Sequence, residues 1–347
     1  MTLLQSLLGI ELPIIQAAMA GVQDSTLAAA VSNAGGLGSL PCALLGGHAL
    51  GSELTALSTQ TSKPFNVNFF CHTPPVVSAA REAIWRSTLA PYYRAAGLDI
   101  DTIPAEAGRT PFNHEAADVL SAFRPKVVSF HFGLPSPELL ARVRALGSKI
   151  LSSATTVEEA RWLELHGVDA IIAQGLEAGG HRGSFLTEDL TTQMGTFALV
   201  QQVVAAVKTP VIAAGGIADA RGVAAAMALG AAGVQVGTAY LLCPEATTSA
   251  VHRAALKSDR ARDTALTNLF TGRPARGIMN RLMKELGAMS DLPPAFPLAA
   301  AALAPLRKKA ESDGSDDFSP LWAGQHAAQC MELPAAELTS GLAVGLR

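Results

Sequence analysis

Eight short apolar runs recur along this 347-residue chain, and each ends in a glycine-rich or polar turn that mostly leads into a helical pattern. Nearly continuous apolar character is typical of parallel strands that are covered on both faces. Eight such strands alternating with helices predict an α/β fold of the TIM (β/α)8 barrel class. The runs are residues 13–19, 37–41, 65–70, 127–133, 149–154, 170–175, 210–216 and 233–241.

A doubly wound sheet would also alternate strands with helices. It normally carries a glycine-rich phosphate-binding fingerprint directly after its first strand. In this chain the early segment AGGLGS, residues 34–39, leads into the second predicted strand instead. The glycine-rich turns that suit a phosphate follow the seventh and eighth strands, and this late placement favours the barrel.

Two segments fall outside the repeat. Residues 72–126 form an insertion after the third strand, and residues 244–347 form a mostly helical extension beyond the barrel of residues 1–243. Insertions after barrel strands lie at the carboxyl-terminal face, where barrel active sites lie. We therefore expect the insertion to form a lid or substrate wall, and the extension to pack at the same side.

Composition excludes several partners. The formal net charge is −3 and aromatic residues make up 5%, so bulk charge and stacking surfaces do not support a nucleic-acid partner. The four cysteines have no metal-ligand spacing, which predicts reduced thiols and no metal. The N-terminus lacks the features of a signal peptide, and no apolar run is long enough for a bilayer. We expect a cytoplasmic protein without a membrane partner.

The two late turns predict a phosphate site. The segment AAGGI contains Gly215 and Gly216 and precedes a helix that Asp219 can cap. The segment QVGT contributes Gln235, Gly237 and Thr238. Glycines let backbone N–H groups approach an anion closely, although the same residues could serve only tight packing of a helix on a strand. No Walker A sequence occurs, which argues against ATP or GTP chemistry.

The loop EAGGHRG, residues 177–183, follows the sixth strand and carries His181 among three glycines. Taken alone, it is compatible with a turn, a phosphate cradle, a metal loop or a catalytic loop. An imidazole can accept or donate a proton near neutrality, and glycines let a loop pass close to a ligand. We therefore expect a functional role for His181. His131, at the end of the fourth strand, is a candidate for substrate binding.

These segments together resemble a known motif series, that of the bacterial class I nitronate monooxygenases, formerly called 2-nitropropane dioxygenases. The matching segments are PIIQAAMAG, NAGGLGSLP, FNVNFF, VVSFHFG, AQGLEAGGHRG, PVIAAGGI, GVQVGT and LWAGQ. The resemblance implies a barrel that binds FMN without a metal. It also implies oxidation of alkyl nitronates, such as propionate 3-nitronate, by O2 through a flavin semiquinone, giving a carbonyl product and nitrite or nitrate. A homodimer is compatible with it.

The resemblance also implies residue roles. His181 would be catalytic, and His131 would contact the substrate. FMN would be bound by Ala18, Met19, Asn68, Gln174, Gly179, Gly215, Gly216, Gln235, Gly237 and Thr238. Relatives that use propionate 3-nitronate place tyrosines and a lysine around it, whereas this chain has three tyrosines in all and carries Phe296 in its extension. A more apolar wall would favour neutral or alkyl nitronates, or another electron acceptor.

Two other functions remain open at this point. Related barrels are FMN-dependent NAD(P)H reductases that act on quinones or enoyl thioesters. A barrel with a phosphate site could also be a non-catalytic binding protein. The histidine in EAGGHRG favours the monooxygenase.

Overall fold

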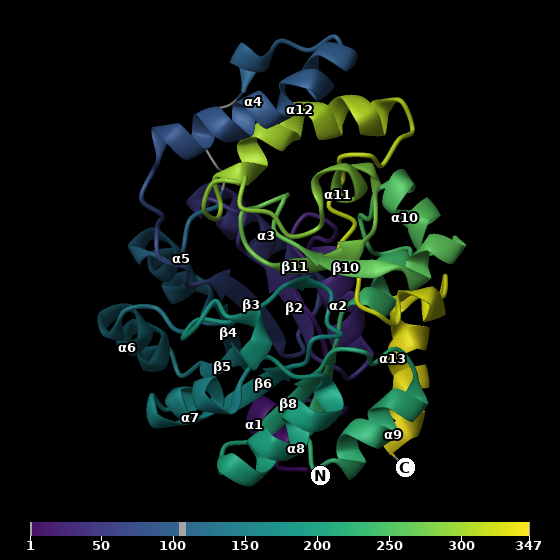
Figure 1. Ribbon diagram of the computed structural model, residues 1–347. Helices are drawn as coiled ribbons and strands as arrows, with labels where there is room; N and C mark the ends of the chain where they lie inside the picture. The colour runs from purple at the N-terminus through teal and green to yellow at the C-terminus, as the bar shows by residue number, and fades with distance from the viewer. Residues whose placement is uncertain (1, 104–108, 347) are drawn as a thin grey trace.

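The computed structural model describes residues 2–103 and 109–346 (Figure 1). Its main sheet contains eight parallel strands in the order β1–β9–β8–β6–β5–β4–β3–β2. A parallel bridge between Ile15 and Leu37 joins the two ends, so the sheet closes into a barrel. The strands are β1 (Ile14–Gln16), β2 (Gly38–Pro41), β3 (Phe65–Phe70), β4 (Val127–His131), β5 (Lys149–Ala154), β6 (Ala170–Gln174), β8 (Val211–Ala214) and β9 (Gly233–Val236). Each lies within a predicted run, and the predicted (β/α)8 fold is confirmed.

An outer ring of helices covers the barrel because each helix buries one apolar face on the strands. The ring consists of α2 (Ser25–Asn33), α3 (Gly47–Gln60), α5 (His114–Phe123), α6 (Pro137–Ala145), α7 (Val157–Leu165), α8 (Thr196–Ala206), α9 (Ala220–Ala228) and α13 (Ala335–Ala343). The last of these comes from the far end of the chain and packs on α2 and α9. Tyr240 and Thr339 share a buried hydrogen bond of 2.9 Å there. The end of the predicted extension therefore completes the outer ring.

A short helix, α1 (Leu3–Leu8), closes the amino-terminal end of the barrel. Leu4 and Leu8 are fully buried and belong to one apolar cluster with Ile15, Ile172 and Ile212. This packing fills the bottom of the barrel with side chains. Ligands are thereby restricted to the opposite end, where the strands finish.

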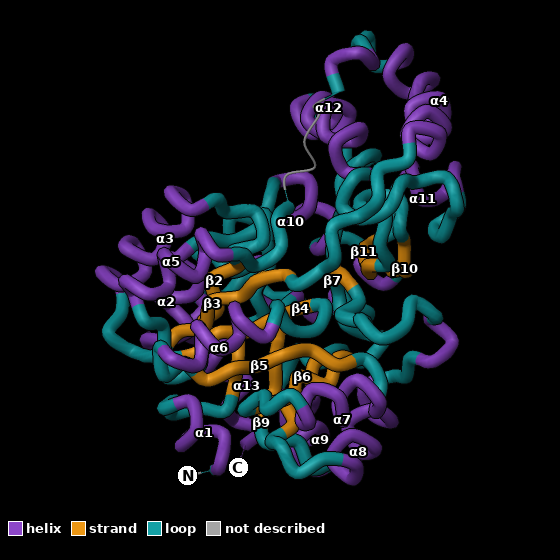
Figure 2. The backbone as a smooth tube through the Cα atoms, turned by 90° about the vertical axis from the view of Figure 1, so that its left-hand side faces the viewer, coloured by secondary structure: helices purple, strands orange, loops and turns teal. Residues whose placement is uncertain are grey.

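A second lobe lies beyond that opposite end (Figure 2). It contains α4 (Ala79–Ala95) from the insertion, with α11 (Arg281–Leu286) and α12 (Ala299–Ser312) from the extension. Helix α10 (Ala250–Leu256) belongs to a separate apolar cluster with Leu241 and Leu242. Helices α4 and α12 lie side by side (Figure 1). The indole of Trp85 donates a hydrogen bond to the carbonyl of Ala299 at 3.2 Å, and the hydroxyl of Tyr93 donates to that of Ala302 at 2.6 Å. The two segments outside the repeat thus share one apolar core.

The extension also contains strands, β10 (Thr264–Thr267) and β11 (Ala275–Ile278). Strand β11 pairs with β7 (Gly180–His181), which belongs to the predicted loop EAGGHRG. The division of the chain at residue 243 remains a prediction. The short 3₁₀ helices are η1 (Ile100–Thr102), η2 (Leu190–Thr192), η3 (Thr238–Leu242), η4 (Asp259–Arg262), η5 (Ala327–Gln329) and η6 (Val344–Leu346). Over the two described ranges, no helix combines the length and the apolar character needed to cross a membrane.

Candidate active site

A cavity opens at the carboxyl ends of the barrel strands, under the second lobe. It encloses about 1340 Å³, counting the space at its mouth. A cavity at the carboxyl-terminal face of a parallel barrel is the usual place of a ligand site. All of the predicted site residues line it: Ala18, Met19, Asn68, His131, Gln174, Gly179, His181, Gly215, Gly216, Gln235, Gly237 and Thr238. The structure brings these residues together, whereas their individual roles remain predictions.

A row of polar side chains crosses the cavity floor from β3 to β4. The amide nitrogens of Asn66 and Asn68 both donate to the hydroxyl of Ser129, each at 2.8 Å. The side-chain oxygen of Asn66 is buried and has no hydrogen-bond partner among the described residues. The sequence analysis did not predict Asn66 and Ser129 as site residues. The two-residue period of a strand indicates them, because it places Asn66 on the same face as Asn68, and Ser129 on the same face as His131.

The loop after β6 is fixed by a buried arginine. The guanidinium of Arg182 is fully buried and donates to the carbonyls of Gln174 and Gly175, both at 2.7 Å. The Gln174 side chain accepts a hydrogen bond from the N–H of Gly183 at 2.8 Å and donates to the carbonyl of His181 at 3.0 Å. These contacts define the path of the loop and therefore the position of His181.

Two glycines of this loop are required by neighbouring protein atoms. A Cβ on Gly179 would lie 2.6 Å from the backbone of both Ala323 and Gly324. A Cβ on Gly183 would lie 2.7 Å from the ring of His131. Gly179 therefore leaves space for the backbone of the extension, and Gly183 leaves space for the imidazole of His131. The sequence analysis instead explained the glycines of this loop by close approach to a ligand.

His181 lies where the barrel meets the extension. Its Nε2 is 2.9 Å from the hydroxyl oxygen of Thr271, in the turn between β10 and β11. Its ring centroid lies 5.4 Å from that of Phe296 and 5.5 Å from that of Trp322. Burial, followed by the positive charge of Arg109, lowers the pKa of His181 well below its ordinary value. The imidazole is therefore neutral at neutral pH.

His131 uses both ring nitrogens within the protein. Its Nε2 lies 3.2 Å from the carbonyl oxygen of His181, which can only accept, so Nε2 carries the hydrogen. Its Nδ1 then accepts from the hydroxyl of Ser153 at 3.0 Å. Burial lowers the pKa of His131 to about 4. This neutral imidazole supports the loop that carries His181.

The glycine turns after β8 and β9 both line the cavity, at the ends of two neighbouring strands. Gly215 and Gly216 have φ values of 115° and 70°, which side-chain-bearing residues rarely adopt. Asp219 caps α9 as predicted, because its carboxylate accepts from the N–H of Gly222 at 2.8 Å. The hydroxyl of Thr238 accepts from the N–H of Gly324 at 3.0 Å. The extension thus reaches the predicted phosphate site.

Several residues that line the cavity come from outside the barrel motifs, namely Arg109, His252, Trp322, Gly324 and His326. Sequence reasoning assigned no role to either of these histidines. His252 is buried, its Nε2 has no partner among the described residues, and burial lowers its pKa to about 4. Trp322 and Gly324 belong to LWAGQ, one of the segments that carry the family resemblance, whereas no local pattern marks Arg109, His252 or His326.

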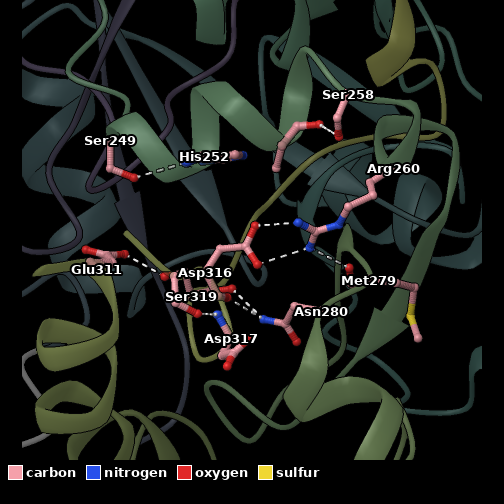
Figure 3. A network of polar contacts seen from close by, with 12 residues as sticks. Ser249, His252, Ser258, Arg260, Met279, Asn280, Glu311, Asp316, Asp317 and Ser319 are labelled. Atoms are coloured by element: carbon pink, nitrogen blue, oxygen red, sulfur yellow. Dashed lines mark hydrogen bonds and ion pairs between the residues drawn. The ribbon is translucent and has the colours of Figure 1, made fainter. Parts of the chain in front are cut away.

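The extension that delivers Trp322 is anchored by a polar network (Figure 3). Arg260 pairs with both carboxylate oxygens of Asp316, at 2.7 and 3.1 Å. The amide of Asn280 donates to the carbonyls of Asp316 and Ser319 at 3.1 and 3.0 Å. This network holds the loop after α12 against α11 and η4, and so fixes the chain that continues to Trp322.

Metal ligands do not gather in the part of the chain that the structure describes. No group of three or more histidine, cysteine, aspartate or glutamate side chains is placed to hold an ion there. The four cysteines, Cys42, Cys71, Cys243 and Cys330, are free thiols.

Comparison with known proteins gives the family of the chain. The sequence model of nitronate monooxygenase matches residues 1–344. The chain belongs to the nitronate monooxygenase family. It is 46% identical to the nitronate monooxygenase of Pseudomonas aeruginosa over 98% of both chains, and 44% identical to that of Paraburkholderia phytofirmans over 97% of this chain and 92% of the relative.

A solved structure agrees with this relationship. The nitroalkane oxidase from Streptomyces ansochromogenes is 39% identical, covers 99% of this chain and 97% of its own, and superposes with a TM-score of 0.89. The family resemblance seen in the sequence motifs is confirmed. The prediction that this protein is an oxidoreductase enzyme is likewise confirmed by its family.

Proposed function

We propose that this protein binds FMN and oxidises alkyl nitronates with O2. Membership of the nitronate monooxygenase family supports nitronates as the substrate class. The observation that carries the proposal is a single cavity that joins His181 to the glycine turns after β8 and β9. One end offers an imidazole for a reacting group, and the other offers backbone donors for a phosphate.

The residues present fit a flavin. Ala17, Ala18, Met19 and Ile172 supply apolar walls for a ring system. The unpartnered oxygen of Asn66 is an acceptor that an N–H of the flavin ring or a hydroxyl of its side chain would satisfy. Asn68, Gln174 and Gln235 would contact the ring edge, and the turn glycines would hold the phosphate. A bound flavin would supply the electron transfer between a nitronate and O2.

His181 would hydrogen-bond the nitronate. In the tautomer whose Nε2 accepts from the Thr271 hydroxyl, Nδ1 carries the hydrogen and would donate it to a substrate oxygen; Nδ1 has no hydrogen bond among the described residues. A neutral imidazole of lowered pKa is a weak base, which favours preformed nitronate anions over the deprotonation of neutral nitroalkanes. His131 would act through His181, since its own nitrogens are occupied. A cytoplasmic location and a homodimer remain predictions.

One spectrum and one titration test this function. The purified protein should show flavin absorbance, and mixing with propionate 3-nitronate in the absence of O2 should reduce the flavin. Rapid bleaching by NADH, with no turnover of nitronates, would overturn the proposal in favour of a reductase. A protein that shows no flavin bands even after FMN is added would instead be a non-catalytic binding barrel.

A further inference from the structure

Arg109 is a partly buried cation in the cavity wall, and no carboxylate of the described residues raises its pKa. It belongs to the insertion and lines the cavity. Its Nε is buried and has no hydrogen-bond partner among the described residues. Burial and the like charge of Arg307 both lower its pKa, so its surroundings disfavour the positive charge. A buried guanidinium in such surroundings is costly unless a bound anion compensates it.

The position of Arg109 is close to His181 but separate from it. The guanidinium carbon lies 5.9 Å from the ring centroid of Phe296. The ring of His181 contacts the same phenylalanine, at a centroid distance of 5.4 Å. The charge of Arg109 acts on the imidazole of His181 and contributes to its lowered pKa. Arg109 and His181 therefore both lie near Phe296 and line one cavity, so a substrate held at His181 would meet Arg109 with a second polar group.

The other charged groups near the cavity are committed to the fold. The carboxylate of Glu177 accepts from the backbone N–H of Thr196 at 2.7 Å and from its hydroxyl at 2.8 Å. The guanidinium of Arg273 lies 4.2 Å from the ring centroid of Phe132 and donates to the carbonyl of Ser184. The Nε of Arg273 also has no partner among the described residues, but Arg273 does not line the cavity, so Arg109 is the arginine of the described cavity wall that a ligand can reach.

We infer that Arg109 binds a carboxylate at the far end of the substrate and makes this enzyme selective for carboxylate-bearing nitronates over simple alkyl nitronates. The planar fork of a guanidinium matches a carboxylate, and a ligand charge compensates the partly buried cation. The inference rests on the proposed function and reverses the expectation of an apolar wall that favours simple alkyl nitronates. Phe296 still provides an apolar contact, for the carbon chain between the two polar ends.

Steady-state kinetics on two matched substrates test this role. Propionate 3-nitronate and propyl-1-nitronate differ in a terminal carboxylate against a methyl group. We expect Arg109→Gln to lower kcat/KM for propionate 3-nitronate by about 10- to 100-fold, mainly through KM, as for loss of a charged hydrogen bond. The value for propyl-1-nitronate should change by less than about threefold. Arg109→Lys should recover part of the loss, and Arg94→Gln, at an exposed arginine of the same insertion, should change neither value.

Flavin absorbance and circular dichroism establish that each variant is folded and loaded. An equal loss for both substrates, or no loss for either, overturns the inference. A binding titration without O2, using 3-nitropropionate and 1-nitropropane, separates it from the proposed function. Selective weakening of 3-nitropropionate by Arg109→Gln supports the inference even if no nitronate is oxidised. If the unmodified protein and Arg109→Gln bind 3-nitropropionate equally well, the inference is overturned even if nitronates are oxidised.

Discussion

The Nε2 of His181 lies 2.9 Å from the hydroxyl oxygen of Thr271, although 90 residues separate them in the chain. His181 belongs to the loop after β6, and Thr271 belongs to the turn between β10 and β11. The barrel therefore supplies the imidazole, and the extension orients it. The chemistry at His181 therefore depends on both the barrel and the extension.

Removing the imidazole should abolish most turnover while the cofactor remains bound. We expect His181→Asn to lower kcat/KM for nitronates by at least about 100-fold, because removing one positioned hydrogen-bond donor from a reacting group costs roughly 10²–10³-fold. Flavin content measured by absorbance should stay unchanged. Kinetics equal to those of the unmodified protein would make His181 a structural residue.

Removing only the hydroxyl of Thr271, which contacts His181, should lower turnover less than removing the imidazole. Thr271→Val keeps the shape of the side chain but loses the hydrogen bond to Nε2, which is worth about 1 kcal/mol. We expect kcat to fall by about fivefold, and His181→Asn/Thr271→Val should be no slower than His181→Asn alone. Additive losses in the double variant would show that Thr271 acts independently of His181.

The contact between Gly179 and the extension predicts a loss of stability. In Gly179→Ala the new Cβ would lie 2.6 Å from the backbone of Ala323 and Gly324, so one chain must move. We expect the free energy of unfolding to fall by about 1–3 kcal/mol, as measured by urea denaturation. Gly51→Ala, in α3 with no atom within 4 Å of the new Cβ, should be neutral or stabilising. The reverse order of stability would contradict the packing described for Gly179.

Arg182 should be more important to the fold than its charge alone implies. Arg182→Lys loses the geometry that satisfies the carbonyls of both Gln174 and Gly175. We expect a loss of about 3–5 kcal/mol in the free energy of unfolding, together with weaker flavin binding. Arg221→Lys is the control, because that side chain is 88% exposed, and surface ion pairs contribute little. Equal stability of the two variants would refute this role.

Buried neutral histidines predict a loss of stability in mild acid. Burial lowers the pKa of both His72 and His252 to about 4, from an ordinary value of 6.5. Above pH 6.5 neither state binds these protons, whereas between pH 6.5 and 4 the unfolded chain binds protons that the folded protein cannot. The free energy of unfolding should therefore decrease as the pH falls through this window.

Denaturation measured at pH 7 and pH 4.5 tests the contribution of one histidine. His72→Leu should remove about 2 kcal/mol of the pH-dependent loss, because the leucine binds no proton. His48→Gln, at an exposed histidine of α3, should leave the pH dependence unchanged. If His72→Leu keeps the full acid sensitivity, the imidazole of His72 is not held neutral by the fold.

The barrel could be predicted from local sequence patterns. A strand that is covered on both faces must be apolar, and the tight turns that follow these strands need glycine. For the same reason the cavity residues at strand ends, such as Asn68 and Gln174, could be placed from the order of residues alone. A parallel barrel brings all carboxyl ends of its strands to one face, so position in the motif determines position in space.

The residues beyond the barrel could not be placed in this way. Arg109 reaches the cavity, and Phe296 and Thr271 reach His181, through packing between segments far apart in the chain, and no periodicity marks them. The steric requirement for glycine at position 179 could not be predicted either. It arises from the backbone at Ala323, 144 residues later in the chain. Sequence alone determined the barrel, its family and the position of its cavity, since these follow from local patterns. Tertiary structure decided what surrounds His181, since burial, charge and hydrogen bonding there arise only when the insertion and the extension fold over the barrel.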